Sequence, residues 1–303
     1  MTNQVYCFGE VLYDLLPDGA HAGGAPMNVA IHLSNLGIKT GMISRVGDDD
    51  LGKNIVAFMN ERDVDTAFVG TDTNYKTGTV TVTFTEKNDP QYVIAHPAAW
   101  DFISVTPTVS MAIGKSKVLV YGSLACRDAH NFETLQSVLK ELQVKNKSEQ
   151  ADVLCIFDVN MRAPFYEKEK IFGLMQLSNI VKMNEDEFEM IADWLNLKGT
   201  ETELGAAILQ AFNLKLLVVT QGARGAIAFQ ETKMFTASTP RIEKVTDTIG
   251  CGDAFLGAFI KKYVFDKLSV TEALRFACAT GALVATYKGA TPRITENQVN
   301  KLF

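Results

Sequence analysis

The chain has 303 residues, of which 47% are hydrophobic and 21% charged, and its formal net charge is −6. This composition is typical of a globular protein with a large core, and because no basic run occurs we expect no nucleic-acid partner. No apolar stretch is long enough to span a membrane, and no signal-peptide pattern precedes the first predicted strand. We therefore expect a cytoplasmic protein with no membrane partner. The five cysteines include no Cys-x-x-Cys pair, which favours buried reduced thiols over disulfides.

Short apolar runs alternate with helical patterns along most of the chain. The first predicted elements are a strand at 5–8, a helix at 27–36, a strand at 41–46 and a helix at 51–59. Later strand candidates lie at 117–121, 153–157, 180–183 and 216–220, with helical patterns at 132–142 and 204–212 among them. Buried runs separated by helices indicate an α/β fold with a mostly parallel central sheet flanked by helices. No linker or repeat interrupts the pattern, so we expect one domain over residues 1–303.

Residues 74–95 interrupt this alternation. The stretch 80–84 alternates apolar and polar side chains, 91–95 is suited to a return strand, and 87–90 carries a turn signal. A half-polar hairpin within an α/β chain predicts a small antiparallel flap. Such a flap can close over a site and exclude water, although an edge hairpin without function explains the pattern equally well.

Residues 246–255 place two glycines and an acid directly before an apolar helical pattern. Gly250 and Gly252 let the backbone turn sharply, and a helix N-terminus adds unpaired N–H groups with partial positive charge. The segment therefore predicts an anion site suited to phosphate, with Cys251 as a small residue in the turn. Asp253 is explained either as a general base for an attacking hydroxyl or as an ordinary helix N-cap.

Polar or glycine-rich segments follow the other strand candidates as well. They are Asp14, Gly23 to Asn28, Asp158 to Arg162, Asn184 to Glu187 and Thr220 to Gly225. Ligands of open α/β sheets collect at the carboxyl ends of strands. Asp14 suits a polyhydroxylated ligand, Arg162 a phosphate or carboxylate, and the acids near Glu187 a magnesium ion held through water. Each segment alone is also explained as an ordinary loop or helix start, but their joint occurrence favours a binding site.

Two nucleotide-binding patterns are excluded. Residues 47–53 match the spacing of a P-loop, but Asn54 stands where Mg²⁺ requires a hydroxyl, and three aspartates within the loop oppose phosphate. No Gly-x-Gly-x-x-Gly follows the first strand, which counts against a dehydrogenase.

The order of these segments resembles the ribokinase-like (PfkB) family of carbohydrate kinases. The N-terminal resemblance lies in Gly23-Gly24-Ala25-Pro26-x-Asn28-x-Ala30 and in the glycine-rich stretch 47–52. Residues 247–253 resemble the C-terminal signature, with Cys251 where the family usually has alanine. The resemblance extends from about residue 5 to about residue 293. Within the family, the pattern at 9–14 with His32, and Ala99-Trp100-Asp101, is most similar to fructokinases.

The resemblance implies a ribokinase-like fold whose lid is formed by about residues 10–22 and 74–98. It implies that Asp253 is the catalytic base and that the backbone of Gly250, Cys251 and Gly252 is the anion hole. It also implies that Asp14, Gly24 and Asn28 hold the sugar, which Arg162 is placed to join.

The resemblance assigns the cofactor side too. Asn184 and Glu187 match an Asn-x-x-Glu motif that organises Mg²⁺ and phosphate, and Thr220 and Gly222 resemble a nucleotide-binding strand end. Asp247 and Ile249 correspond to positions that hold a monovalent cation, such as K⁺, in some members.

The implied activity is ATP-dependent phosphorylation of a sugar hydroxyl, with fructose as first choice. One rival is a 2-keto-3-deoxygluconate kinase, although such kinases often carry a flap arginine where this chain has Ile94. Other sugar or nucleoside kinases of the family, and a catalytically silent sugar-binding regulator, are further alternatives. The expected partners are therefore a sugar and ATP. The sequence leaves the oligomeric state undecided between a monomer and a homodimer.

Overall fold

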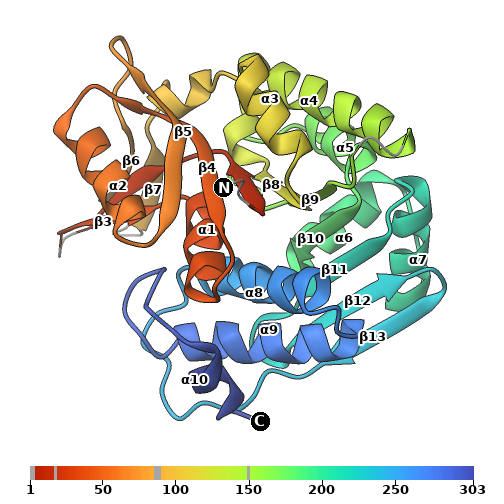
Figure 1. The fold of residues 1–303 in the computed structure, drawn as a ribbon. Coiled ribbons are helices and arrows are strands. Elements are labelled where there is room, and N and C mark those ends of the chain that lie inside the picture. The colour runs from red at the N-terminus through yellow and green to blue at the C-terminus, as the bar shows by residue number, and fades with distance from the viewer. Residues whose placement is uncertain (1–3, 17–18, 85–89, 149–150) are drawn as a thin grey trace.

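The computed structural model describes residues 4–16, 19–84, 90–148 and 151–303. Its centre is a nine-stranded sheet with the spatial order β13-β12-β11-β10-β9-β8-β1-β4-β5 (Figure 1). The strands are β1 (Val5–Phe8), β4 (Thr40–Gly47), β5 (Val64–Asp72), β8 (Val118–Gly122), β9 (Leu154–Asp158), β10 (Ile180–Asn184), β11 (Leu216–Thr220), β12 (Ala226–Gln230) and β13 (Lys233–Ala237).

In this sheet the seven neighbouring strands β11, β10, β9, β8, β1, β4 and β5 are all parallel, whereas β12 pairs antiparallel with β11 and with β13. This confirms the predicted mostly parallel sheet. The pattern had not predicted β5, because that edge strand carries partly exposed and polar positions. Since the parallel strands run in one direction, their carboxyl ends meet along one edge, where the polar segments were expected to converge.

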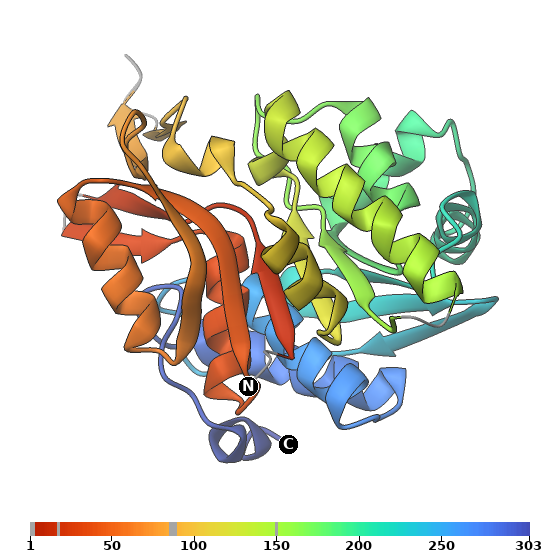
Figure 2. The ribbon, with the colours of Figure 1, turned by 45° about the horizontal axis from the view of Figure 1, so that its top comes forward.

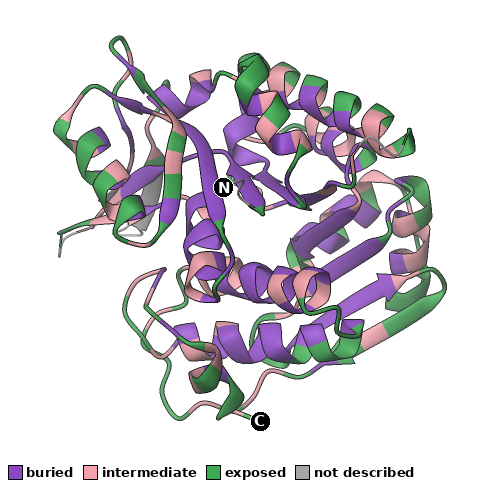
Figure 3. Ribbon diagram, in the orientation of Figure 1, coloured by how far each residue is buried: buried purple, intermediate pink, exposed green. Residues whose placement is uncertain are grey.

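Helices cover both faces of this sheet, and each face has its own hydrophobic core (Figures 1 and 2). One face carries α1 (Ala25–Asn35), α2 (Asp50–Asn60), α8 (Cys251–Ile260), α9 (Val270–Val284) and the short α10 (Glu296–Asn300). The other carries α3 (Pro107–Gly114), α4 (Ala129–Lys147), α5 (Lys168–Gln176), α6 (Glu185–Trp194) and α7 (Glu201–Ala211). In Figure 3 the central strands are buried almost throughout. Among the helices of the described ranges, none has the length and apolar character needed to cross a bilayer.

Single helical turns complete the fold at the ends of longer elements. They are η1 (Ala99–Phe102), η2 (Leu124–Cys126), η3 (Gly222–Arg224) and the π-helical η4 (Lys261–Phe265) that continues α8. Of these, η1 lies where the chain passes from the flap region to the core, and η2 joins β8 to α4.

A separate four-stranded sheet forms the predicted flap, which we call the lid sheet. Its order is β3-β2-β6-β7, from β2 (Leu12–Leu16), β3 (Gly19–Gly23), β6 (Gly78–Phe84) and β7 (Pro90–Ile94). The two hairpins β2/β3 and β6/β7 are antiparallel, and a parallel pairing of β2 with β6 joins them. The hairpin at 80–95 is therefore confirmed, although most of its expected turn at 87–90 lies outside the described residues.

Candidate active site

The N-terminus of α8 begins with a left-handed turn that only glycine fits well. Gly250 is the N-cap residue with φ 75°, and a Cβ on it would lie 2.4 Å from the carbonyl oxygen of Ala290. In the described part of the chain no side chain caps this helix end. The Cys251 N–H donates to the Thr248 carbonyl oxygen at 3.3 Å, and the N–H groups that follow it remain available to an anion, as expected of a phosphate site.

Asp253 lies in the first turn of α8 and not at its N-cap, so helix capping does not explain this residue. Its Oδ2 accepts a hydrogen bond from Asn28 Nδ2 at 2.8 Å, which joins the first turn of α1 to that of α8. Burial raises the pKa of Asp253 to about 6 and the nearby charge of Asp158 adds to the rise, whereas the bond from Asn28 and the charge of Lys182 oppose it. A carboxyl group that ionises just below neutral pH is suited to act as a general base.

A buried ion pair that the sequence pattern did not select lies beside Asp253. Lys182 Nζ in β10 contacts Asp158 Oδ1 at the end of β9 at 2.9 Å, and the two residues are only 7% and 3% exposed. The sequence pattern did not predict a role for Lys182, because the residue lies within the apolar run 180–183, which predicts an ordinary buried strand. The available signal was a charged residue in the middle of a strand expected to be covered on both faces.

Asn184 and Glu187 form a reciprocal cap at the start of α6. Asn184 Oδ1 accepts from the Glu187 backbone N–H, and Glu187 Oε2 accepts from the Asn184 backbone N–H, both at 2.8 Å. Glu187 Oε1 also accepts from the Met161 backbone N–H at 2.7 Å. Burial raises the pKa of Glu187, whereas the charge of Lys182 lowers it. Each carboxylate oxygen keeps a second lone pair, so the residue fits a magnesium ion held through water.

A large cavity of about 620 Å³ opens on one side of the α8 N-terminus. Among the predicted site residues, Thr220, Gly222, Cys251 and Gly252 line it. Much of the remaining wall comes from the loop after β13 and from α9 with its C-cap, which the sequence pattern had not assigned to the site: Thr239, Pro240, Arg241, Ile242, Val245, Cys278, Gly281, Ala282 and Ala285. The volume and the largely apolar wall suit a nucleotide base.

The cysteines follow the expectation for free thiols. All five are unpaired, and four are buried, with half-buried Cys251 as the exception. Burial raises the pKa of Cys251 to about 11, and the neighbouring charges of Asp247 and Asp253 act in the same direction. The thiol therefore stays protonated near neutral pH, which argues against a nucleophilic role and for a small side chain in the cavity wall.

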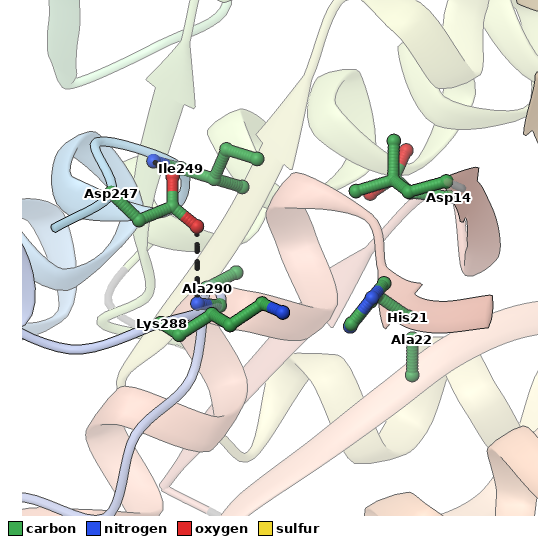
Figure 4. A pocket seen from close by; sticks show the side chains of 9 residues that line it. Asp14, His21, Ala22, Asp247, Ile249, Lys288 and Ala290 are labelled. Carbon is green, nitrogen blue, oxygen red and sulfur yellow. Dashed lines mark hydrogen bonds between the residues drawn. The ribbon is translucent and has the colours of Figure 1, made fainter. Parts of the chain in front are cut away.

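A small cavity of about 40 Å³ lies between the lid sheet and the loops at 247–249 and 288–290 (Figure 4). Asp14 and His21, on neighbouring strands of the lid sheet, face it from one side, and Asp247, Ile249 and Lys288 from the other. Burial raises the pKa of Asp14, and the charges of His21 and Arg162 lower it. The tertiary structure thus brings the predicted sugar ligand Asp14 next to the predicted cation loop.

Two backbone segments fix the geometry around this cavity. At Gly24, φ is 116° and a Cβ would lie 2.4 Å from the Glu10 carbonyl oxygen, so the glycine allows the segment after β1 to approach the start of α1 closely. Asp247 Oδ1 accepts from the Ile249 backbone N–H at 3.0 Å. Its Oδ2 accepts from the Gly289 backbone N–H at 3.1 Å, which is the dashed line in Figure 4. Carbonyl groups held in such a loop fit a monovalent cation.

Arg162 is exposed, and its Nη1 donates to its neighbouring Met161 carbonyl oxygen at 3.1 Å. Its charge nevertheless lowers the pKa of Asp14 and Asp253 together, so it lies near both halves of the site. Asn184, Glu187 and Arg162 line neither cavity as the structure describes them. Ile94, where an acid-sugar kinase often has arginine, packs against a small apolar cluster of Ala98, Trp100 and Leu124.

Comparison with known proteins agrees with this arrangement. The family model of the pfkB family carbohydrate kinases matches residues 5–297. A probable fructokinase-5 from Arabidopsis thaliana is 30% identical over 97% of this chain and 94% of its own length, and a fructokinase-2 from Oryza sativa subsp. japonica is 28% identical over 96% and 91%. The chain belongs to the pfkB family of carbohydrate kinases.

Solved structures show the same fold. A fructokinase from Xylella fastidiosa with bound ATP aligns with a TM-score of 0.84 at 23% identity, over 99% of this chain and 98% of that one. A fructokinase from Vibrio cholerae O395, bound to fructose, ADP and calcium, aligns with a TM-score of 0.81 at 23% identity, over 99% of both chains. These neighbours show the ribokinase-like fold, and membership of the family makes the protein a phosphotransferase that acts on a sugar hydroxyl.

Proposed function

We propose that this carbohydrate kinase transfers the γ-phosphate of ATP to a hydroxyl group of fructose. The observation that carries the proposal is the Asn28–Asp253 pair at the uncapped N-terminus of α8, with a nucleotide-sized cavity on one side and the Asp14 cavity on the other. The fructokinases among its relatives support fructose as the acceptor.

Asp253 takes the proton of the attacking hydroxyl as that hydroxyl approaches the γ-phosphate. Asn28 holds the carboxylate in place through its 2.8 Å hydrogen bond. The backbone of Gly250, Cys251 and Gly252 holds the transferring group, for which the Cys251 N–H gives up its 3.3 Å bond to Thr248, and the helix N-terminus stabilises the negative charge. No new covalent bond to the enzyme is needed, since the chemistry is mainly positioning and charge stabilisation.

The lining of the two cavities supports Thr220 and Gly222 for the nucleotide and Asp14 for the sugar, and the family pattern supplies the other assignments. The nucleotide is bound by Thr220, Gly222 and Asn184. Glu187 would hold Mg²⁺ through water, and the ion would neutralise further negative charge on the phosphates. Asp14, Gly24 and Arg162 hold the sugar. The main chain of the loop at Asp247 and Ile249 is the candidate site for a monovalent cation such as K⁺.

A panel of acceptors tests the proposal. We expect kcat/KM with ATP to be highest for fructose among fructose, ribose, a nucleoside and 2-keto-3-deoxygluconate, because Ile94 offers no positive charge to a carboxylate. A preference for the acid sugar would instead identify a 2-keto-3-deoxygluconate kinase. Sugar binding without ATP turnover would identify a silent regulator.

A further inference from the structure

Lys182 is an unusual residue for its position in the fold. It lies in β10, a central strand in which the hydrophobic residues Ile180, Val181 and Met183 are also buried. Its ammonium group reaches Asp158 Oδ1 at 2.9 Å in neighbouring β9. Removing two charges from water is expensive, and apolar side chains of similar size would often serve stability as well. The pair therefore calls for a role other than holding the sheet together.

The ammonium group lies against the first turn of α8. A Cβ built on Gly252 would stand 3.4 Å from Lys182 Nζ, so the cation sits directly beside the main chain that forms the anion site. Burial lowers the pKa of Lys182, but the charges of Asp158, Glu187 and Asp253 outweigh it and raise the pKa above its usual value. Lys182 thus keeps its positive charge next to the predicted position of the transferring phosphate.

Lys182 engages only one carboxylate oxygen of Asp158. Its Oδ2 is buried and has no hydrogen-bond partner among the described residues. The charge of Asp158 raises the pKa of Asp253, and the charge of Lys182 lowers it. Asp253 is also faced by Asn28 from α1 and by Arg162 from the loop after β9, and its charge acts on Glu10 after β1 and on Cys251 in the same turn.

We propose that Lys182, held in place by Asp158, is a positioning residue of phosphoryl transfer whose buried charge acts on both Asp253 and the Gly250–Gly252 turn. This inference rests on the proposed function, because it assigns the turn to the transferring phosphate. With ATP bound, the cation adds positive charge beside the α8 N-terminus where negative charge collects. In the free enzyme it favours the ionised, proton-accepting form of Asp253 over the protonated form.

Substitution of the lysine tests the proposal first. In Lys182→Met the apolar stem is kept and the charge is lost, and we expect kcat to fall about 10²–10³-fold, the loss typical of one missing donor at such a site. Because this variant leaves Asp158 buried without its partner, the double variant Asp158→Asn/Lys182→Met is made beside it. The double variant removes both charges, so it should fold where the single variant does not, and its kcat should still be at least about tenfold below wild type.

A matched control separates charge at the site from the general effect of losing a buried lysine. Lys262 lies in η4, beyond the far end of α8, and is also 7% exposed. It pairs with Asp266 at 2.9 Å and with Glu296. Lys262→Met should lower the melting temperature and leave kcat within about twofold of wild type. If the folded double variant at positions 158 and 182 recovers wild-type kcat, Lys182 has a structural role only and the proposal is wrong.

The pH dependence of kcat/KM gives a second, sign-dependent readout. Loss of the positive charge in Lys182→Met should move the acid limb to higher pH, and loss of the negative charge in Asp158→Asn should move it to lower pH. Shifts of the same sign would overturn the proposal. Wild-type turnover of ATP with fructose is measured in the same series, so that failure of the proposed function shows as an inactive wild type, whereas failure of this inference shows in the variants alone.

Discussion

Arg127 and Lys182 are both buried cations paired with a buried aspartate, but their surroundings differ. Arg127 binds Asp101 through two hydrogen bonds, from Nε at 2.7 Å and from Nη2 at 2.6 Å. Its Nη2 also donates to the Ala95 carbonyl oxygen at 2.7 Å, and its guanidinium lies 3.9 Å from the ring centroid of Trp100. Lys182 makes one bond to Asp158, whose second oxygen stays without a partner within the described residues.

The difference follows from where each pair lies. Ala95 directly follows β7, so the planar, bidentate Arg127 joins the lid sheet to the core in a fixed geometry. Lys182 is a point charge beside Asp253 and the α8 turn, where a single contact leaves its field free to act on the site. The Arg127–Asp101 pair therefore fixes the position of the lid sheet, whereas the Lys182–Asp158 pair places a positive charge beside the site. Four predictions test the two regions.

The largest expected effect is that of Asp253→Asn. Asparagine keeps the size of the side chain, and its Oδ1 still accepts the bond from Asn28, but it cannot take a proton. We expect kcat to fall at least about 10²-fold, within the range of about 10²–10⁴ for a positioned base. The melting temperature and sugar affinity should stay nearly unchanged. Steady-state kinetics with thermal unfolding checks this, and a near-native kcat would remove the catalytic assignment.

Arg127→Lys should act on stability and on the sugar rather than on chemistry. Lysine keeps the charge but loses the bidentate contact and the position over Trp100, so we expect a loss of about 3 kcal/mol in the free energy of unfolding. Because the lid is then held less firmly, KM for the sugar should rise severalfold with kcat within about twofold. Urea unfolding and kinetics check this against Lys262→Met, and an equal rise of KM in that control would argue against a lid-specific role.

The pH dependence of stability tests Glu10, which is 2% exposed at the end of β1. Burial raises its pKa from 4.5 to about 7, and the charge of Asp253 acts in the same direction. Since the folded state then binds the proton more tightly than the unfolded state, this contribution is fully present below about pH 4.5 and is lost as the pH rises through about 7. At 1.36 kcal/mol per pKa unit, the loss is about 3 kcal/mol.

Glu10→Gln removes this titration. Urea unfolding at pH 5 and pH 8 should therefore show a smaller fall in stability for the variant than for wild type. An unchanged difference between the two pH values would mean that other groups cause the fall.

The smallest expected effect is local protection of the lid sheet. If the lid closes over bound sugar, amide hydrogen exchange in β2, β6 and β7 should slow when fructose is added. Exchange in β9 and β10 should change little, because these strands are already buried. Equal exchange with and without saturating sugar would make the lid sheet a structural edge.

Much of the fold could be predicted from the sequence because local patterns determine it. Buried runs at 153–157 and 180–183 predicted strands that the structure shows as β9 and β10. The glycine pair around Cys251 predicted a helix start with exposed N–H groups, and α8 begins there. The lid hairpin was also predicted, whereas the parallel pairing of β2 with β6 was not, since it joins segments more than 60 residues apart in the chain.

The sequence by itself determined the elements, the glycine turns and the candidate base, because these depend on side-chain periodicity and on backbone freedom at single residues. Only the tertiary structure decided which of these groups act on one another. Asn28 reaches Asp253 across 225 positions of the chain, and Lys182 meets Asp158 only because β9 and β10 are neighbours in the sheet. The pKa of Asp253 depends on burial and on charges brought together by folding, which no local pattern contains.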